Sequence, residues 1–210
     1  ITFTPVTASV DSNQIIDMYT NVNVTIPAGS LFYKDWLVTE EDLAGNWIEQ
    51  LDYEAEFAFV IGKRAKDVSE EDALDYVAGY AVSNDVTYRD FQRRTLQWLQ
   101  GKTVDGSLPM GPWMVTSDEL TNPSGLEMVL TVNGEERQRT NTANQVFSVQ
   151  YLVSFLSSIA TLEPGDIVIT GTPGGVGVAR EPQTWLKDGD VVSISVEKVG
   201  TLTNTVKSVK

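Results

Sequence analysis

The pattern of apolar and polar positions from residue 51 onward predicts most of the strands of this chain. Residues 52–61 alternate in side-chain character and end at Gly62, as expected for a strand that places successive side chains on opposite faces. One face is wholly apolar, and the other begins with Glu54 and Glu56 and turns apolar after them. We therefore predict a strand that is covered on both sides.

Two other segments carry helical periodicity. Ser69 and Asp72 form a capping-box pattern, which predicts a helix that begins there and ends at Gly79. Residues 146–159 repeat apolar side chains at helical spacing behind Asn144, a candidate N-cap.

The remaining segments add strands rather than helices. Residues 126–139 are predicted to form a hairpin around Asn133-Gly134, since Asn-Gly supplies the positive φ angles of a type I′ turn. Strands outnumber helices without regular alternation, so the predicted class is α+β with sheet dominant. Further strands are expected at residues 80–84, 166–170, 191–197 and 201–206, with a loop and a short polar helix at 85–98. We expect an irregular N-terminal segment at residues 1–50 and one domain at 51–210.

Composition and charge exclude several classes of function. The 210 residues carry a net charge of −14, which disfavours partners with phosphate backbones and anionic membrane surfaces. The chain has no histidine and no cysteine, so a Ser-His-Asp triad, a thiolate nucleophile and a His-ligated or Cys-ligated zinc are excluded. It has no apolar run of membrane-spanning length and no signal-peptide core, and we expect a cytoplasmic or mitochondrial protein.

The two glutamates of the strand at 52–61 are the first candidates for chemistry. Their i, i+2 spacing puts Glu54 and Glu56 on one face, with Cα atoms roughly 6.5–7 Å apart. Like charges beside apolar positions are costly unless a positive group lies between them, and a divalent cation with oxygen ligands would supply it. The pair alone is nevertheless more typical of an exposed edge strand with both glutamates in water.

Asp85 lies where the predicted strand at 80–84 ends, a usual place for a functional side chain. The commoner role of Asp85 or Thr87 in such a position is to cap the following helix, with Asp90 in its first turn. Capping alone would not explain the two glutamates on a neighbouring strand.

Two loops complete the set of candidates. Residues 171–177, Gly-Thr-Pro-Gly-Gly-Val-Gly, lack the Gly-Lys-Ser/Thr of a Walker loop. Their backbone N–H groups can hold a carboxylate and the Thr172 hydroxyl can add a bond, and a tight turn forced by glycine is an equal alternative. A lone lysine such as Lys102 is usually a solvated surface group, but the Gly, Pro and Trp around it indicate an ordered loop, in which a placed ammonium is more common.

Taken together, these segments resemble the fumarylacetoacetate hydrolase superfamily, in the family's order and from about Leu51 to the C-terminus. The matching stretches are Asp52-Tyr53-Glu54-Ala55-Glu56, residues 84–90 (Asn-Asp-Val-Thr-Tyr-Arg-Asp), Gly101-Lys102, residues 109–113, residues 133–135, residues 162–166, residues 171–177 and Gly189-Asp190.

The resemblance implies a fold, a metal and a set of site residues. The fold is a rolled mixed β-sandwich with a few peripheral helices, commonly in a homodimer. Mg²⁺ or Mn²⁺ would be bound by Glu54, Glu56 and Asp85. Lys102 would be catalytic, and the substrate contacts would be Arg89, Gln92, Lys102, Gly171 and Thr172.

The N-terminal part departs from the family pattern. Members usually carry a segment whose His and Glu form a lid that activates water, whereas Tyr19-Thr20 here runs directly into the sequence that follows the lid. We therefore expect that a lid is missing from this chain at Thr20/Asn21.

The resemblance implies chemistry through a metal-stabilised enolate of a 2-oxo acid or β-diketo acid, such as a small dicarboxylate. Hydrolytic C–C cleavage of the fumarylacetoacetate hydrolase or acylpyruvase type is the first expectation, and it requires a base that activates water. Oxaloacetate decarboxylation and keto–enol tautomerisation or isomerisation are the alternatives. A catalytically silent, metal-binding dimeric relative is the alternative from another class.

Overall fold

The computed structural model describes residues 14–17, 22–25 and 49–207. The chain divides into two compact units, residues 1–47 and 48–210. In the first unit, β1 (Gln14–Asp17) and β2 (Val22–Thr25) pair in antiparallel fashion. The predicted lid position at Thr20/Asn21 lies outside the described residues, so the missing lid stays a prediction.

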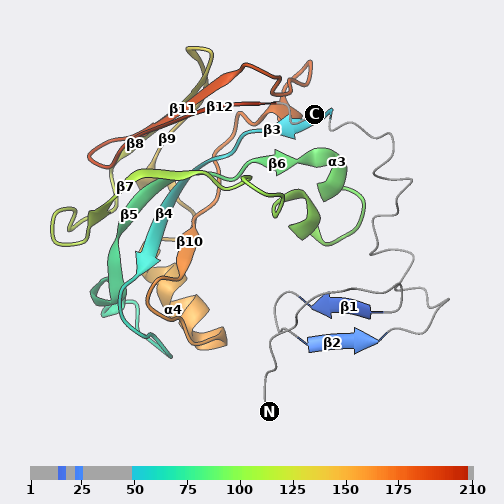
Figure 1. The fold of residues 1–210 in the computed structure, drawn as a ribbon. Coiled ribbons are helices and arrows are strands. Elements are labelled where there is room, and N and C mark those ends of the chain that lie inside the picture. Colours follow the sequence, from blue (N-terminus) through green and yellow to red (C-terminus); the bar gives the residue numbers. More distant parts are fainter. Residues whose placement is uncertain (1–13, 18–21, 26–48, 208–210) are drawn as a thin grey trace. The chain divides into compact units, whose positions relative to one another are not determined.

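The second unit contains two four-stranded sheets whose neighbouring strands run antiparallel (Figure 1). The first sheet has the order β10 (Ile167–Ile169), β4 (Ala55–Ile61), β5 (Val77–Asn84) and β7 (Met110–Thr116). The second has the order β12 (Gly200–Thr205), β11 (Val191–Val196), β8 (Glu127–Val132) and β9 (Glu135–Asn141). A short ladder joins β3 (Leu51–Asp52) to β6 (Thr87–Tyr88).

The core forms around β4, which is buried on both faces as its sequence predicts. Phe57 and Phe59 on one face and Ala58 on the other are at most 1% exposed. Phe57 stacks on Tyr80 of β5 with ring centroids 5.4 Å apart, and Leu130 of the second sheet belongs to the same apolar cluster. The sheet-dominated α+β class is confirmed.

The helix predicted at residues 69–79 is wrong. Ser69 and Asp72 do form the predicted local bonds, but they lead only into the 3₁₀ turn η1 (Ala73–Tyr76). β5 begins at Val77 and pairs with both β4 and β7. Two ladders of backbone hydrogen bonds thus override a local capping signal.

The predicted helix at 146–159 begins later than the apolar pattern suggests. It is α4 (Val149–Ile159), and its N-cap is Ser148, whose hydroxyl accepts a bond from the backbone N–H of Tyr151. Asn144 is not the cap, because it ends the 3₁₀ turn η3 (Thr142–Asn144).

The predicted hairpin is confirmed by the β8–β9 pair, with Asn133 and Gly134 at positive φ. The strands predicted nearest the C-terminus are confirmed within one or two residues as β10, β11 and β12. The short polar helix is α3 (Arg89–Gln92), and two further 3₁₀ turns are η2 (Trp98–Gly101) and η4 (Gly177–Ala179). Among the helices of the described residues, none combines the length and apolarity needed to cross a membrane.

Candidate metal centre

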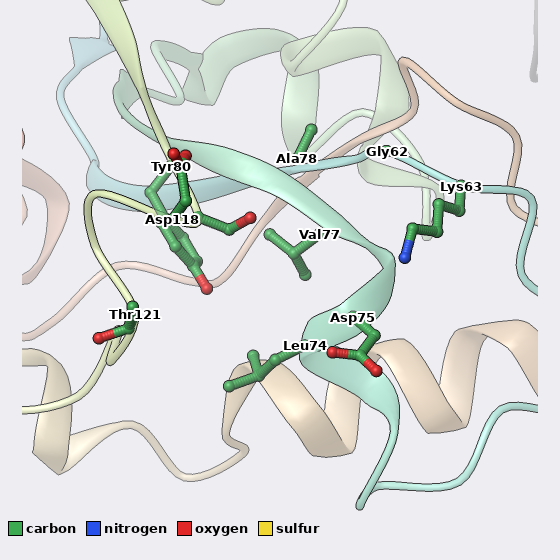
Figure 2. Close-up of a pocket in the computed structure, with 10 residues that line it drawn as sticks. Gly62, Lys63, Leu74, Asp75, Val77, Ala78, Tyr80, Asp118 and Thr121 are labelled. Carbon is green, nitrogen blue, oxygen red and sulfur yellow. The ribbon is translucent and has the colours of Figure 1, made fainter.

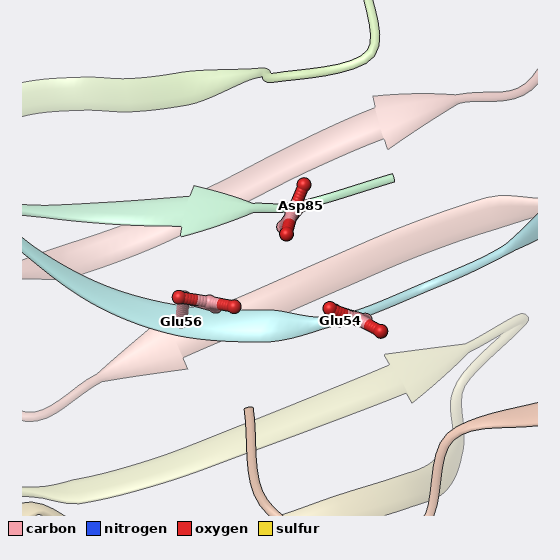
Figure 3. A group of neighbouring side chains, drawn as sticks. All are labelled: Glu54, Glu56 and Asp85. Carbon is pink, nitrogen blue, oxygen red and sulfur yellow. The ribbon is translucent and has the colours of Figure 1, made fainter. Parts of the chain in front are cut away.

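Three carboxylates meet where β4 begins and β5 ends. The register pairs Ala55 with Asn84, and the backbone N–H of Asp85 donates to the Glu54 carbonyl at 2.9 Å. Carboxylate oxygens of Glu54, Glu56 and Asp85 lie within 4.8 Å of one another (Figure 3). The strand register therefore brings together acidic groups that lie far apart in the sequence.

These carboxylates are buried, with exposed fractions of 7%, 3% and 7% for Glu54, Glu56 and Asp85. β4 lies between β10 and β5, so the alternative of an exposed edge strand with its glutamates in water is wrong. A buried cluster of like charges requires positive compensation.

Lys102 supplies part of this compensation. Its Nζ lies 2.7 Å from Glu54 Oε2 and 2.6 Å from Asp85 Oδ2, so it is not a solvated surface group. Lys102 follows η2, and η2 packs closely on α3, because a Cβ on Gly101 would come within 2.7 Å of the backbone at Gln92 and Tyr88. This close packing places the Lys102 ammonium next to the carboxylates of Glu54 and Asp85.

Arg89 supplies the second positive charge. Its NH2 lies 2.7 Å from Glu54 Oε1, and its NH1 donates to Gln92 Oε1 at 2.9 Å. Helix α3 begins at Arg89 with no side-chain cap, and the Asp85 carboxylate binds Lys102 instead. The capping role considered for Asp85 is therefore not observed.

The glycine-rich loop holds a carboxylate of the protein itself. The backbone N–H of Gly171 donates to Glu56 Oε2 at 2.7 Å, and Gly171 adopts φ +93°. The Thr172 hydroxyl accepts a bond from Gln138 Nε2 at 2.9 Å. The loop thus adjoins the cluster through Gly171, and Gln138 fixes Thr172 beside it.

The protonation of the cluster follows from its burial and charge. Burial raises the pKa of Glu56 to about 7, with the Gly171 N–H opposing and the charges of Asp85 and Glu54 adding to the shift. Burial also raises the pKa of Asp85, against the effect of Lys102. Burial disfavours the charged form of Lys102, but hydrogen bonds to Asp85 and Glu54 outweigh it and raise the pKa of Lys102. The lysine therefore stays an ammonium.

The donor set fits a hard divalent cation. Carboxylate oxygens are the ligands that Mg²⁺ and Mn²⁺ prefer. The connected side chains comprise four carboxylates, Asp52 included, and two cations, Arg89 and Lys102. With all four carboxylates ionised, two negative charges are left over, and one divalent ion would balance them.

Two residues of this network escaped the sequence-based prediction. Asp52 binds Arg89 Nε at 3.0 Å, and Gln138 links Thr172 to the backbone N–H of Ala55. Asp52 carries a signal in the sequence, because it continues the i, i+2 alternation of Glu54 and Glu56. Gln138 carries none, since its role depends on a contact 83 residues away along the chain.

Cavities in the described part of the chain lie outside the carboxylate cluster, and two of them border strands or loops already discussed. One of about 540 Å³ lies at the other end of β4, and its lining includes Gly62, Lys63 and Tyr80, whose hydroxyl points into it (Figure 2). The other, of about 360 Å³, lies beside the glycine-rich loop and includes Gly171 and Thr172 in its lining. The second cavity therefore adjoins the carboxylate cluster through Gly171.

Comparison with known proteins identifies the family. Residues 11–207 match the family described as "Fumarylacetoacetate (FAA) hydrolase C-terminal". "Oxaloacetate tautomerase fahd2, mitochondrial" of Xenopus laevis is 46% identical over 160 residues, which cover 75% of this chain and 50% of that protein. This chain spans about half the length of the curated relatives it matches.

Solved structures agree in fold as well as in sequence. Fumarylacetoacetate hydrolase from Exiguobacterium antarcticum matches with a TM-score of 0.74 at 43% identity, over 76% of this chain and 57% of that one. Fumarylpyruvate hydrolase from Pseudomonas aeruginosa in complex with Mn²⁺ and pyruvate matches with a TM-score of 0.71 at 34% identity, over 78% and 68%. The chain therefore belongs to the fumarylacetoacetate hydrolase family and has its fold.

Proposed function

We propose that this chain provides the metal-dependent centre of an enzyme that interconverts the keto and enol forms of oxaloacetate. The observation that carries the proposal is the buried group of Glu54, Glu56 and Asp85 with Lys102 Nζ beside it. The name of the Xenopus laevis relative supports oxaloacetate as the substrate. The complex of the Pseudomonas aeruginosa enzyme with Mn²⁺ and pyruvate supports a divalent cation and a 2-oxo acid.

Glu54, Glu56 and Asp85 would hold Mg²⁺ or Mn²⁺. A bound divalent cation would act as a Lewis acid that favours enolisation of a 2-oxo acid. The backbone N–H of Gly171 keeps Glu56 Oε2 in place.

Lys102 and Arg89 are the cations that would face an anionic substrate. Lys102 forms ion pairs with Glu54 and Asp85, and its ammonium would donate to the oxygen on which negative charge develops during enolisation. Arg89 would bind a substrate carboxylate, with its guanidinium orientation set by Gln92. Thr172, held by Gln138, would orient the substrate from the loop.

Tautomerisation is preferred over hydrolysis because of what each reaction demands. Both reactions need a group that carries a proton, but tautomerisation consumes no water, whereas C–C hydrolysis also needs a base that activates water. The described residues 49–207 contain no histidine, and the cluster carboxylates are engaged with Lys102, Arg89 and Gly171. Hydrolysis stays the second candidate, because the Exiguobacterium antarcticum and Pseudomonas aeruginosa proteins are both named as hydrolases.

The test uses oxaloacetate and acetylpyruvate as substrates and distinguishes tautomerisation, release of pyruvate and C–C cleavage. With Mn²⁺, we expect rapid loss of the enol absorbance of oxaloacetate without release of pyruvate, and EDTA should abolish it. Glu56→Gln, which keeps the shape but removes a ligand charge, should lower the rate at least about 100-fold. Glu163→Gln, at an exposed surface ion pair with Arg64, should leave the rate unchanged.

Any product other than the keto form of oxaloacetate would assign a different reaction to the chain. Pyruvate formed in step with enol loss would make the chain a decarboxylase, and cleavage of acetylpyruvate would make it a hydrolase. Equal rates with metal and with EDTA would overturn the metal-dependent proposal. Homodimer formation and a cytoplasmic or mitochondrial location stay predictions from the resemblance.

A further inference from the structure

Asp52 is a wholly buried carboxylate with partners in three parts of the fold. Its Oδ1 accepts bonds from the backbone N–H groups of Tyr53 at 2.9 Å and Gly177 at 2.7 Å. Its Oδ2 accepts bonds from the Val178 N–H and from Arg89 Nε, both at 3.0 Å. A buried carboxylate needs such donors, and these belong to the segment that leads into β4, to η4 and to α3.

The Arg89 guanidinium connects Asp52 to the metal centre. Its NH2 lies 2.9 Å from Asp52 Oδ2 and 2.7 Å from Glu54 Oε1. Asp52 neutralises part of the positive charge of Arg89, so Arg89 offsets less of the negative charge of Glu54. More of the Glu54 charge is then available to attract a bound cation.

The glycine-rich loop is attached at both ends to the chain segment that carries the cluster. Its first residue, Gly171, donates to Glu56 Oε2 at 2.7 Å, and Gly177 at its end donates to Asp52 Oδ1 at 2.7 Å. The two acceptors belong to one short segment, residues 52–56. The loop is therefore held as a closed arch over this segment.

Two further attachments lie between these ends: Tyr53 Oη donates to the Gly175 carbonyl at 3.0 Å, and Gln138 binds the loop near its start. Gln138 accepts a bond from the Ala55 N–H at 3.0 Å and donates to Thr172 Oγ1 at 2.9 Å and to the Pro173 carbonyl at 2.8 Å. The position of Thr172 thus depends on the same segment that carries the metal ligands.

We propose that Asp52 is a positioning residue that couples the glycine-rich loop to the metal centre. On one side it sets the Arg89 guanidinium against Glu54, and on the other it holds the end of the loop through Gly177 and Val178. Its effect on cation binding rests on the proposed metal site, whereas its effect on the loop does not.

The first experiment measures amide hydrogen exchange in the metal-free chain. Asp52→Asn can keep an oxygen for Gly177 but presents an NH₂ group to Arg89 and Val178. We expect exchange at Gly171, which does not touch Asp52, to rise at least about tenfold in this variant. Asp90→Asn is the matched control, because the Asp90 carboxylate also holds two backbone N–H groups, those of Glu49 and Gln50, and exchange at Gly171 should not change.

The second experiment is a double-mutant cycle on the dissociation constant for Mn²⁺. Asp52→Asn should weaken Mn²⁺ binding about tenfold, because it leaves the Arg89 charge uncompensated beside Glu54. In an Arg89→Gln background the same change should have less than about a twofold effect, because the charge through which Asp52 acts is gone.

The outcomes separate this inference from the proposed function. Faster exchange confined to Gly177 and Val178, or an equal loss of Mn²⁺ affinity in both backgrounds, would overturn the coupling. A wild-type chain that binds no Mn²⁺ would overturn the proposed metal site, and the exchange at Gly171 would still decide the role of Asp52. If Asp52→Asn does not fold, Asp52→Glu keeps the charge but displaces it, and unchanged exchange at Gly171 would again overturn the coupling.

Discussion

At the scale of single residues, Glu56 links the acidity of the cluster to the stability of the fold. Burial, reinforced by Asp85 and Glu54, raises its pKa from 4.5 to about 7. Between these two values the folded protein binds a proton that the unfolded chain releases. The contribution of this proton to the free energy of unfolding is therefore fully present below about pH 4.5 and is lost as the pH rises through about 7. For the metal-free chain, we expect the free energy of unfolding to fall by up to about 3 kcal/mol over that range, measured by denaturant titration in EDTA.

A variant isolates this contribution from those of other titrating groups. Glu56→Gln should flatten the pH dependence across that window, whereas the surface variant Glu163→Gln should keep the wild-type slope. Stability that rises with pH in the wild type relative to Glu56→Gln would contradict the expected protonation.

We expect Lys102 to have opposite effects on metal binding and on turnover at the proposed site. In Lys102→Met, Glu54 and Asp85 lose the ammonium that lies 2.7 and 2.6 Å away. We expect Mn²⁺ to bind about tenfold more tightly, because a competing positive charge is removed, while turnover of oxaloacetate falls about 100-fold. Calorimetry and enol absorbance measure the two quantities.

Lys66→Met is the control for this prediction. Its Nζ donates to the carbonyls of Ser157 and Ser158 at 3.1 and 3.0 Å, outside the cluster. Both quantities should stay at wild-type values in this variant. Unchanged turnover in Lys102→Met would remove the lysine from the proposed site.

The grouping of the three carboxylates was accessible to sequence reasoning because a strand has a fixed period, and their role as metal ligands stays a prediction. Glu54 and Glu56 must share a face, and a residue that ends the neighbouring strand, such as Asp85, can lie beside them. The partners of Gln138 were not predictable in this way, since they depend on how a distant hairpin packs on β4.

At the scale of elements, the main error concerns residues 73–79. Their local signals favour a helix, and the Ser69–Asp72 bond forms as the capping box requires. The segment nevertheless becomes η1 and then β5, because β5 fills the place between β4 and β7. A single-sequence pattern reports local preference, and the competing strand pairs form between residues far apart in the chain.

Gly79 leaves the space that the pairing of β5 with β7 requires. In the sequence it resembles a helix stop, but in the sheet it permits β7 to approach, since a Cβ there would collide with the Val115 carbonyl and lie 2.8 Å from Met114 Cγ. Gly79→Ala should therefore lower the free energy of unfolding by about 2 kcal/mol or more, measured by denaturant titration.

Gly174→Ala provides the comparison for this prediction. Gly174 lies in the glycine-rich loop, and a Cβ there would meet no atom within 4 Å. This substitution should change the stability little. Equal stability of the two variants would show that β7 can shift away from Gly79 at little cost.

At the scale of the whole molecule, the family and fold could be predicted from motif order, but the reaction could not. In the chemistry that the family resemblance implies, tautomerisation, decarboxylation and hydrolysis would share an enolate and one set of metal ligands. They differ in whether water is activated, and the lid that does so in the family would lie near Thr20/Asn21, outside the described residues. The names of the relatives, rather than the geometry, therefore favour oxaloacetate.

The contacts of the carboxylate cluster that the structure describes all lie within residues 49–207. The cluster, its cations and the arch of the loop come from residues 52–178, and the backbone of Gln50 and Leu51 is tied to Arg89 and Leu186. We propose that residues 51–210 form the metal-binding domain, and we expect a fragment that begins at Ile48 to fold and to bind Mn²⁺ within about threefold of the affinity of the full chain.

Circular dichroism and calorimetry on the fragment and the full chain test this expectation, with Glu56→Gln in the fragment as the control that should lose Mn²⁺ binding. A fragment that folds but binds Mn²⁺ more than about tenfold more weakly would show that residues 1–47 contribute to the site. A different result would be a fragment that folds and binds Mn²⁺ but turns over oxaloacetate only as part of the full chain. That result would assign the first unit to catalysis. Cation binding needs only the carboxylates, whereas turnover also needs the groups that exclude or activate water.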